Sequence, residues 1–531
     1  MAGTKIGKYV LESLTRSMYD DSRCIYREYV QNAADQIDIA QKEHLDKDNY
    51  YDIQINIDSD NRRIEIVDTA TGVTFDKINV LRDVACSQKR RGFQKGFRGI
   101  GRLGGLGYCS SLVFETSAKG ESIKTVMRWN ADEMNRIVDD ESDTSEAGDV
   151  IDKCVQISKE QEKIEAHYFK VILEKVSDDK LLDPEGISNY LSMVAPVDYP
   201  TGFAKFGHTI KQYMKENGLS LDTYNIFVNG DQIYKGYTTR IKNDRDGDYD
   251  IKDIKFFQQK DKDDNFIYWG WYSISELKGQ IPAYNLPYGI RLRCKNIQIG
   301  DENTCRNFFV ADGDKRFSQY FYGELNVVSP DLQPDGRRDY LREGSQRRAF
   351  ESQVTEDFLV LKELCNEASD IRGTQKKITN AIQKKANIEK KRNAGFLNQA
   401  EQKKCEDEFK TYEQERAKAH KKLERLKQKS EERQSPLSFM YKQIEENATK
   451  VEGGSSNDPI ENKAVPKLTP DEQQIAQEQS PKLRTDASRY KKFSKKEKDV
   501  INKVYDAIYM AIADENMRES LINKIEEEIT R

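Results

Sequence analysis

Apolar and polar residues alternate in two neighbouring segments near the start of the chain. Residues 51–57 (YDIQINI) and 62–67 (RRIEIV) carry apolar residues at every second position, and the polar residues 58–61 separate them. Because successive side chains of a strand point to opposite faces, this alternation is typical of half-buried strands, and the polar interval is typical of a turn. The two segments therefore predict a β-hairpin that ends at Asp68.

More segments are rich in the aromatic and β-branched residues that favour strands: 168–176, 224–229, 266–274, 289–299 and 320–328. We expect the last four to form the sheet of a second α/β domain. Residues 130–163 are instead acidic and poor in apolar residues, which indicates a solvated surface loop between strands.

The pattern changes to a helical one towards the C-terminus. Residues 375–392 and 397–433 repeat apolar residues at spacings of three, four and seven among many charges, and Asn-Ala-Gly separates them. This predicts a helical hairpin or coiled coil within residues 371–435, followed by a flexible linker at 436–489 and a helical segment at 490–531. The basic residues could contact nucleic acid, but the interspersed glutamates favour a solvated helix that binds a protein partner.

Three polar residues mark one face of an apolar-periodic segment near residue 30. Glu28, Asn32 and Asp35 fall within about 60° of one another on a helix. A carboxylate can take a proton from water, and a carboxamide oxygen suits a hard cation such as Mg²⁺. The alternative is a surface helix with ordinary polar residues.

Two turn-like segments follow. Asp68 opens D-T-A-T-G-V-T, in which a carboxylate precedes a tight turn at Gly72; such a carboxylate can accept a hydrogen bond from adenine N6. Residues 96–107 hold a dense set of glycines after a basic stretch, and free backbone amides of that kind can wrap a phosphate chain. A plain turn and a flexible surface loop are the alternatives. Neither a Walker-type phosphate loop nor a dinucleotide fingerprint occurs.

In this order and spacing the three segments resemble the GHKL ATPase superfamily (gyrase, heat-shock chaperone, histidine kinase, MutL), whose nucleotide pocket is the Bergerat fold. The E-x-x-x-N-A-x-D match at residues 28–35 is complete, and Gly96, Gly99 and Gly101 meet G-x-x-G-x-G. Ala70 departs from D-x-G-x-G, although the D-T-x-x-G-x-T of the chaperone branch is kept; the final G-T box before the strand at 168–176 is not found.

The resemblance implies roles for these residues. Glu28 would be the general base, Asn32 the Mg²⁺ ligand and Asp68 the adenine reader, with a phosphate lid at 87–107. The nucleotide contacts it implies are Asn32, Asp35, Asp68, Gly72, Thr74, Ser87, Lys89, Gly96, Phe97, Arg98, Gly99, Ile100 and Gly101. The implied fold class is α+β: a Bergerat-type α/β sandwich at 1–178, a transducer-like α/β middle domain at 179–370 and a helical, coiled-coil C-terminal region.

The second domain contains a further resemblance. Residues 331–339 (DLQPDGRRD) are similar to a chaperone middle-domain segment that supplies an arginine to the γ-phosphate, and Arg338 falls on that arginine, with Arg337 the weaker candidate. A guanidinium matches phosphate oxygens in bidentate fashion. The alternative is a local surface ion pair. Gyrase- and MutL-like relatives use a lysine of this domain instead.

The function that these features predict is an ATP- and Mg²⁺-dependent clamp that hydrolyses ATP and, like its relatives, forms a homodimer. A heat-shock-chaperone-like clamp for a polypeptide is favoured by Arg338. The alternatives are a nucleic-acid clamp of the MORC or MutL kind, for example in prokaryotic defence or DNA maintenance, and a scaffold that binds ATP without turnover. A histidine kinase is disfavoured, because no phosphoacceptor helix precedes the pocket.

Composition adds little to this prediction. The 531 residues predict two or three domains, and the net charge of −5 gives no overall attraction to nucleic acid or membranes. The eight cysteines lack metal-site or disulfide spacing. No apolar run of about eighteen residues and no signal-peptide core occur, so we expect a cytoplasmic protein without membrane contact.

Overall fold

The computed structural model describes residues 5–16, 19–86, 95, 99–245, 247–396, 399–444, 501 and 524–525. The chain forms two compact units, residues 1–450 and 451–531, and only three described residues belong to the second. The expected linker and C-terminal segment therefore lie, from residue 445 onward and apart from these three residues, outside the described part of the chain. The described residues form an α+β fold, as expected.

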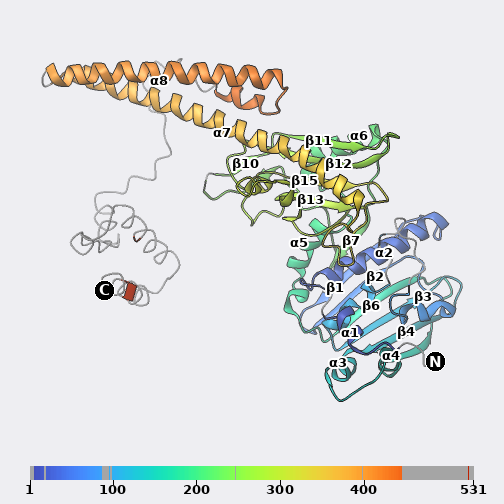
Figure 1. Ribbon diagram of the computed structural model, residues 1–531. Helices are drawn as coiled ribbons and strands as arrows, with labels where there is room; N and C mark the ends of the chain where they lie inside the picture. The colour runs from blue at the N-terminus through green and yellow to red at the C-terminus, as the bar shows by residue number, and fades with distance from the viewer. Residues whose placement is uncertain are drawn as a thin grey trace. The chain divides into compact units, whose positions relative to one another are not determined.

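The first sheet has eight strands in the order β5-β4-β3-β6-β2-β1-β7-β8 (Figure 1). The strands are β1 (Asp52–Asp58), β2 (Arg63–Asp68), β3 (Ser111–Ser117), β4 (Ile123–Asn130), β5 (Val155–Gln161), β6 (Tyr168–Glu174), β7 (Asn225–Val228) and β8 (Asp231–Gln232). Strands β1 and β2 pair antiparallel with Ile53 opposite Asp68, which confirms the expected hairpin. Ile53, Ile55 and Ile57 are buried at alternate positions, as a half-buried strand requires.

Strand β7 corrects one expectation about the second domain. Residues 224–229 were expected in the sheet of that domain, but β7 lies parallel to β1 in the first sheet, with Asp52 opposite Asn225. The alternating pattern in the sequence indicates that a strand forms, but it does not indicate which other strand it pairs with. Pairing covers the edge of β1, which would otherwise expose backbone donors and acceptors. The division of the chain at residue 178 stays a prediction.

Five helices contribute to the apolar core of the first sheet: α1 (Tyr9–Leu14), α2 (Cys24–Glu43), α3 (Ala131–Asp139), α4 (Ala147–Cys154) and α5 (Pro184–Val194). Helix α2 buries Ile25, Val30 and Ile37 in this core. It ends at His44, whose left-handed backbone (φ 49°, ψ 48°) returns its amide to the carbonyls of the last turn.

The expectation of a surface loop at residues 130–163 is wrong. This segment forms α3, α4 and strand β5, which pairs with β4. Asn130 caps α3 by accepting a hydrogen bond from the Glu133 amide at 3.0 Å. The segment has few apolar residues, but Met134, Ile137 and Val138 recur at helical spacing and are buried, which is sufficient to pack a short helix.

The second sheet has five strands in the order β11-β12-β15-β13-β14. They are β11 (Asp253–Lys260), β12 (Phe266–Ile274), β13 (Gly289–Cys294), β14 (Ile297–Gln298) and β15 (Tyr322–Val327). Helix α6 (Ala204–Glu216) packs on this sheet through a cluster of aromatic rings, and β9 (Arg240–Ile241) and β10 (Tyr249–Asp250) form a separate pair. The 3-10 helices are η1 (Phe75–Leu81), η2 (Gly101–Gly107), η3 (Asp179–Leu182), η4 (Thr201–Phe203), η5 (Thr304–Phe308) and η6 (Lys315–Tyr320).

The segment 289–299, expected as one strand, is a hairpin. Strands β13 and β14 pair antiparallel, and Lys295 and Asn296 between them both adopt left-handed backbone (φ 52° and 60°). Two positive φ angles are what a tight two-residue hairpin turn requires, and asparagine tolerates that region better than most residues. The consequence is that Lys295 stands at the tip of a hairpin.

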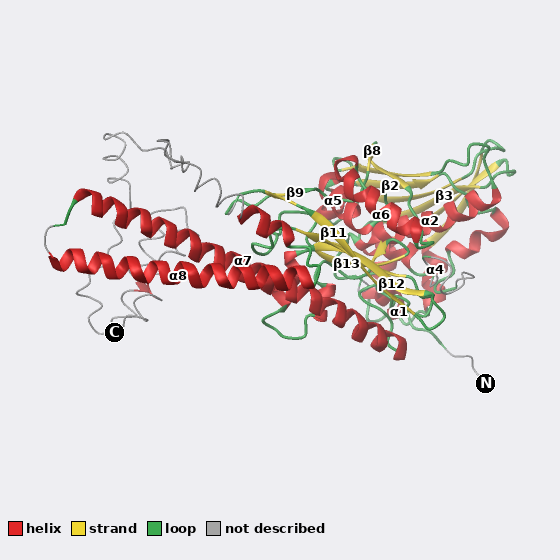
Figure 2. Ribbon diagram, turned by 90° about the horizontal axis from the view of Figure 1, so that it is seen from above, coloured by secondary structure: helices red, strands yellow, loops and turns green. Residues whose placement is uncertain are grey.

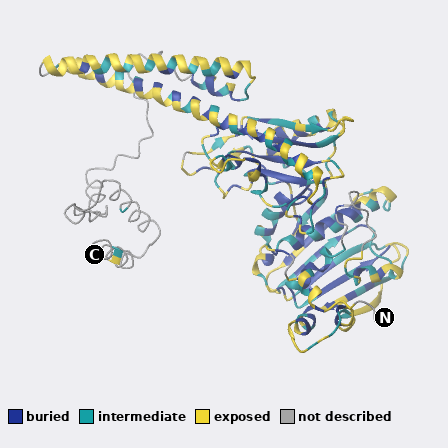
Figure 3. Cartoon of the chain, viewed as in Figure 1, coloured by how far each residue is buried: buried dark blue, intermediate teal, exposed yellow. Residues whose placement is uncertain are grey.

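Two long helices follow, α7 (Ser345–Ala394) and α8 (Gln399–Glu432), and they lie side by side (Figures 1 and 2). Ion pairs Asp370–Lys422 at 2.7 Å and Glu363–Arg433 at 3.0 Å show that they run antiparallel. Helix α8 exposes most of its residues (Figure 3). Leu437 and Met440 join the core on α7, so packing continues past residue 435, where the linker was expected to begin.

Charge explains why the two helices pair in this way. Residues 372–392 of α7 hold eight basic residues and one acidic residue, whereas residues 399–415 of α8 hold six acidic and three basic residues. These stretches lie together, because Lys384 stands 4.5 Å from the Tyr412 ring centre and Arg392 4.6 Å from that of Phe409. The basic stretch of α7 therefore faces an acidic stretch of its own chain.

Candidate functional site

A cavity of about 330 Å³ lies between α2, the first sheet and the loop that follows β15. That volume is at the lower end of the range for small-molecule sites, roughly 300–1,000 Å³. Both sheets contribute to its lining. The predicted site residues among the lining are Glu28, Asn32, Asp68, Gly72, Gly99, Ile100, Gly101 and Arg338.

Helix α2 supplies one polar wall of the cavity. Glu28, Asn32 and Gln36 recur at intervals of four residues and line the cavity together. The Glu28 carboxylate is 12% exposed, and its Oε1 lies 3.3 Å from the Arg27 guanidinium. Gln36 Oε1 accepts a hydrogen bond from Thr71 at 2.7 Å, which ties α2 to the turn after β2. Of the three positions that the sequence places on one face, Glu28 and Asn32 line the cavity, and Gln36, which was not predicted, adds a second amide to the same surface.

Asp35 and Thr74, both predicted to contact nucleotide, are not among the lining residues. Asp35 is buried, and its Oδ1 accepts a hydrogen bond from the amide of Lys95, which itself lines the cavity, at 2.7 Å. Thr74 precedes η1, and its hydroxyl is buried without a hydrogen-bond partner among the described residues. Asp35 therefore holds the backbone of Lys95 in place. The position of Asp35 on the helix face could not distinguish this structural role from direct contact with a ligand.

An apolar slot with one carboxylate forms the second wall. Ile66 of β2 and Phe169 and Val171 of β6 line the cavity beside Asp68. Asp68 is buried at the end of β2, and its Oδ1 accepts a hydrogen bond from the Ala70 amide at 3.1 Å. A flat apolar slot suits an aromatic base, and a buried carboxylate suits an amine on its edge.

Gly72 is required by the close approach of two backbone segments. Its φ is +65°, and a Cβ added there would lie 1.9 Å from the Ser117 carbonyl oxygen. Neither the conformation nor the space admits a side chain. The turn D-T-A-T-G is thereby held against β3, which fixes Asp68 at the cavity wall.

The glycine-rich segment approaches the Glu28 carboxylate. A Cβ added at Gly101 would lie 2.5 Å from Glu28 Oε2, so a side chain there would displace the Glu28 carboxylate from its position beside η2. Gly99, with φ +71°, lines the cavity together with Ile100. The predicted contacts Ser87, Lys89, Gly96, Phe97 and Arg98 lie outside the described residues.

Arg338 reaches the same cavity from the second sheet. Its guanidinium is buried and donates a hydrogen bond to the Lys95 carbonyl, while its backbone adopts φ 58°, which is uncommon for arginine. Burial lowers the pKa of Arg338, against the opposing pull of the Glu28 carboxylate. The neighbouring Arg337 carbonyl accepts a hydrogen bond from Arg27 at 2.9 Å, and its own side chain is exposed.

Lys95 connects the parts of this arrangement. Its ammonium group is 2% exposed and lies 2.6 Å from Asp38 on α2 and 3.0 Å from Asp222. Burial opposes its charge, but these two carboxylates raise the pKa of Lys95 above its usual value. Because Asp35 and Arg338 bind its amide and carbonyl, a single lysine joins α2 to the loop that carries Arg338.

Several lining residues from the second sheet and its loops were not predicted. Cys294 and Lys295, at the tip of the β13–β14 hairpin, both line the cavity. Burial lowers the pKa of Lys295, and the nearby Lys95 acts in the same direction. The asparagine at 296 was the available signal for a turn, but no motif indicated which surface the turn would meet.

The arrangement fits a purine nucleoside triphosphate. The slot beside Asp68 accommodates an aromatic base, the glycine-rich backbone lies at the Glu28 end, and Arg338 adds a cation there. Among the described residues no group of three or more histidine, cysteine, aspartate or glutamate side chains could hold a metal ion. A Mg²⁺ ion would therefore depend on Asn32 and on phosphate oxygens, which is how Mg²⁺ is commonly held.

The described helices include none with the length and apolar character that crossing a lipid bilayer demands.

Comparison with known proteins gives a partial similarity. A scan against protein families finds no match. The chaperone protein HtpG of Shouchella clausii (strain KSM-K16) is 25% identical over 190 residues, which is 32% of this chain. The chain spans only 30% of the length of that relative. The similarity supports a distant, GHKL-like relationship over part of the chain.

Proposed function

We propose that this chain is a Mg²⁺-dependent ATPase that works as a chaperone-like clamp. The observation that carries the proposal is that Glu28, on helix α2 beside the first sheet, and Arg338, in the loop after β15 of the second sheet, meet in one cavity. The same cavity also contains a buried carboxylate beside apolar side chains. The partial similarity to a chaperone protein supports the same function.

In the proposed reaction water attacks the γ-phosphorus of ATP, the bond from this phosphorus to the β–γ bridging oxygen breaks, and ADP and phosphate leave. Arg27 holds Glu28 Oε1, and Oε2 faces Gly101, so the carboxylate is oriented to accept the proton of a water beside the glycine-rich backbone. Asp68 would accept a hydrogen bond from the adenine amine. Asn32 would hold Mg²⁺ through its amide oxygen, and the ion would supply positive charge that offsets the charge of the phosphates.

Arg338 would stabilise the negative charge that develops on the transferred phosphoryl group. Because it comes from the loop after β15, hydrolysis would depend on the position of the second sheet relative to the first. Such dependence is what couples nucleotide state to conformation in ATP-driven switches. As in the relatives that the sequence resembles, the clamp would be a homodimer.

The basic stretch of α7 gives little support to a nucleic-acid clamp. An acidic stretch of α8 lies beside it, so part of its positive charge is compensated within the chain. We therefore propose a polypeptide client.

The test is ATP hydrolysis by the purified full chain with and without Mg²⁺, together with the affinity for a non-hydrolysable ATP analogue. The proposal expects Mg²⁺-dependent release of phosphate and a dimer that forms or tightens with the analogue, measured as mass in solution. Binding of ATP without phosphate release would contradict the enzyme and leave a nucleotide-binding scaffold.

A further inference from the structure

A fully buried group of charges lies between the two sheets, outside the nucleotide cavity. It consists of Lys235, Arg293 and Glu324, whose side chains are all 0% exposed. Lys235 follows β8 of the first sheet, whereas Arg293 lies on β13 and Glu324 on β15 of the second. We call these three residues the buried charge cluster.

Glu324 is held by four side chains. Its carboxylate accepts hydrogen bonds from Lys235 Nζ at 2.7 and 3.0 Å, from Tyr199 Oη at 3.0 Å and from Tyr237 Oη at 3.1 Å. Arg293 Nε lies 2.7 Å from its Oε1. Because these four side chains surround the carboxylate, they hold the Glu324 side chain in one conformation.

Glu324 is ionised although it is buried, whereas burial and the charge of Arg293 lower the pKa of Lys235 to about 7. Although burial alone would raise it, the charges of Arg293 and Lys235 hold the pKa of Glu324 at about 2. Removing one partner of a buried ion pair is strongly destabilising, whereas an apolar replacement of the whole pair is often neutral. Such a cluster is therefore better suited to fix a geometry than to add stability.

The cluster joins backbone segments of both sheets. The Lys235 amide donates to the Asp198 carbonyl at 2.8 Å, and Arg293 Nη2 donates to the Met193 carbonyl at the end of α5 at 2.5 Å. Lys235 and Met193 belong to the β8 loop and to the helix that pack with the first sheet. Arg293 and Glu324 thus fix the second sheet to the first.

The two strands that carry the cluster lead directly into the cavity. Strands β13 and β15 are parallel, with Arg293 opposite Asn326. The next residues along them, Cys294 and Lys295 on one and 327–328 on the other, line the cavity. At about 3.3 Å per residue, the cluster is roughly 3–13 Å along the backbone from those residues.

We propose that Glu324 is a positioning residue for ATP hydrolysis, which holds β13 and β15 so that Lys295 and Arg338 enter the nucleotide cavity at the correct depth. The inference rests on the proposed function. A displacement of about 1 Å at such a distance from the chemistry can lower the rate about 10²-fold.

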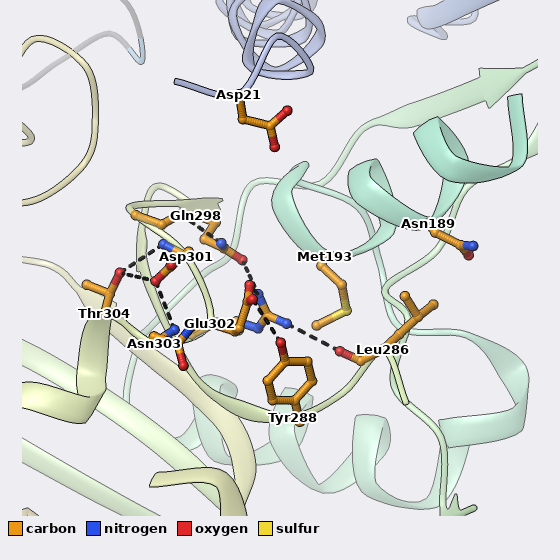
Figure 4. Close-up of polar contacts among 12 residues, drawn as sticks. Asp21, Asn189, Met193, Leu286, Tyr288, Gln298, Asp301, Glu302, Asn303 and Thr304 are labelled. Carbon is orange, nitrogen blue, oxygen red and sulfur yellow. Dashed lines mark hydrogen bonds and ion pairs between the residues drawn. The ribbon is translucent and has the colours of Figure 1, made fainter. Parts of the chain in front are cut away.

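A second arginine–glutamate pair on the same strand provides a matched control. Arg291, two residues before Arg293, lies 3.1 Å from Glu302, whose side chain is 30% exposed. Tyr288 also donates to Glu302, at 2.8 Å, and Figure 4 shows this hydroxyl directed at the carboxylate. Tyr288 and Arg291 belong to the second sheet and its loops, so this pair does not connect the two sheets.

The experiment compares Glu324→Gln with Glu302→Gln in the full chain. We expect Glu324→Gln to lower kcat about 10- to 100-fold, with the Kd for a non-hydrolysable ATP analogue within about threefold of wild type. Glu302→Gln should leave both unchanged. Rates are measured well below the melting temperature of each variant, so that unfolding of the variant does not lower the measured kcat. A kcat of Glu324→Gln equal to that of Glu302→Gln would overturn the inference.

A milder variant covers the case in which Glu324→Gln does not fold. Tyr199→Phe removes one hydroxyl donor from Glu324 and leaves the ring and the charges in place. The inference expects a lower kcat at unchanged Kd, and an unchanged kcat would overturn it. A wild-type chain that does not hydrolyse ATP would overturn the proposed function and this inference together, whereas an active wild type with insensitive variants would overturn the inference alone.

Discussion

The proposed nucleotide cavity and the buried charge cluster each place a glutamate beside an arginine, but they hold it in opposite ways. Glu28 has one cationic partner at 3.3 Å and is open to a cavity that both sheets line. Glu324 is enclosed by two cations and two hydroxyl groups and is 0% exposed. A carboxylate must reach water to accept its proton, whereas one that sets geometry must not move. The surroundings of each glutamate thus decide which role it can take.

The largest effect should come from Arg338, which reaches the cavity from the loop after β15. Arg338→Lys keeps the charge but loses the planar fork, and we expect kcat to fall about 10³- to 10⁵-fold, which corresponds to about 4–7 kcal/mol, with nucleotide binding kept. Arg337→Lys is the matched control, because its side chain is exposed in the same loop. Steady-state phosphate release measures both. Equal rates for the two variants would remove Arg338 from the reaction.

Glu28→Gln should have the next largest effect. It keeps the shape of the side chain but removes the proton acceptor, so we expect kcat to fall about 10²- to 10⁴-fold while the Kd for ATP stays within a few-fold. Glu43→Gln, at the exposed end of α2, should change neither value. Single-turnover hydrolysis with an excess of enzyme separates the chemical step from product release. Undiminished turnover in Glu28→Gln would show that another group activates the water.

The pH dependence of stability should reveal the enclosed and ionised state of Glu324. The pKa of Glu324 is lowered from 4.5 to about 2 in the folded chain, so its contribution to stability is complete above pH 4.5 and is lost as the pH falls towards 2. That shift corresponds to about 3 kcal/mol. The melting-temperature gap between wild type and Glu324→Gln should therefore narrow below pH 4.5. A gap that is constant from pH 6 down to pH 3 would contradict this assignment.

The smallest effect should be on base recognition at Asp68. Asp68→Asn replaces a charged acceptor, and a hydrogen bond to a charged group is worth about 1.5–3 kcal/mol, so we expect the Kd for ATP to rise about 10- to 100-fold. Inosine triphosphate, which lacks the exocyclic amine, should bind wild type and variant about equally. Calorimetric titration measures both nucleotides. A variant that still prefers ATP would place the base elsewhere.

The cavity could be predicted from the sequence to the extent that its residues are close along the chain. Four-residue spacing on one helix was sufficient to bring Glu28 and Asn32 together, and the β1–β2 hairpin follows from alternation alone. The glycine at 72 follows from a turn that admits no side chain. Arg338 was predicted only through the resemblance, since nothing local to residues 331–339 indicates which surface the loop meets.

The remaining features of the fold and the site depend on contacts between residues that are distant in sequence. The strand pattern at 224–229 does not reveal that β7 pairs with β1, about 170 residues earlier in the chain. Glu324 looks like an ordinary polar position of an alternating strand, and only the packed structure shows that Lys235 and Arg293 enclose it. The acidic segment 130–163 was misjudged because its overall polarity concealed the few apolar residues that pack its helices.

The most direct test of the account is a crystal structure of the full chain with Mg²⁺ and a non-hydrolysable ATP analogue. The account predicts the adenine amine on Asp68, Mg²⁺ on Asn32, and the γ-phosphate between Glu28 and the Arg338 guanidinium. A nucleotide bound elsewhere, or a γ-phosphate that Arg338 does not reach, would contradict it.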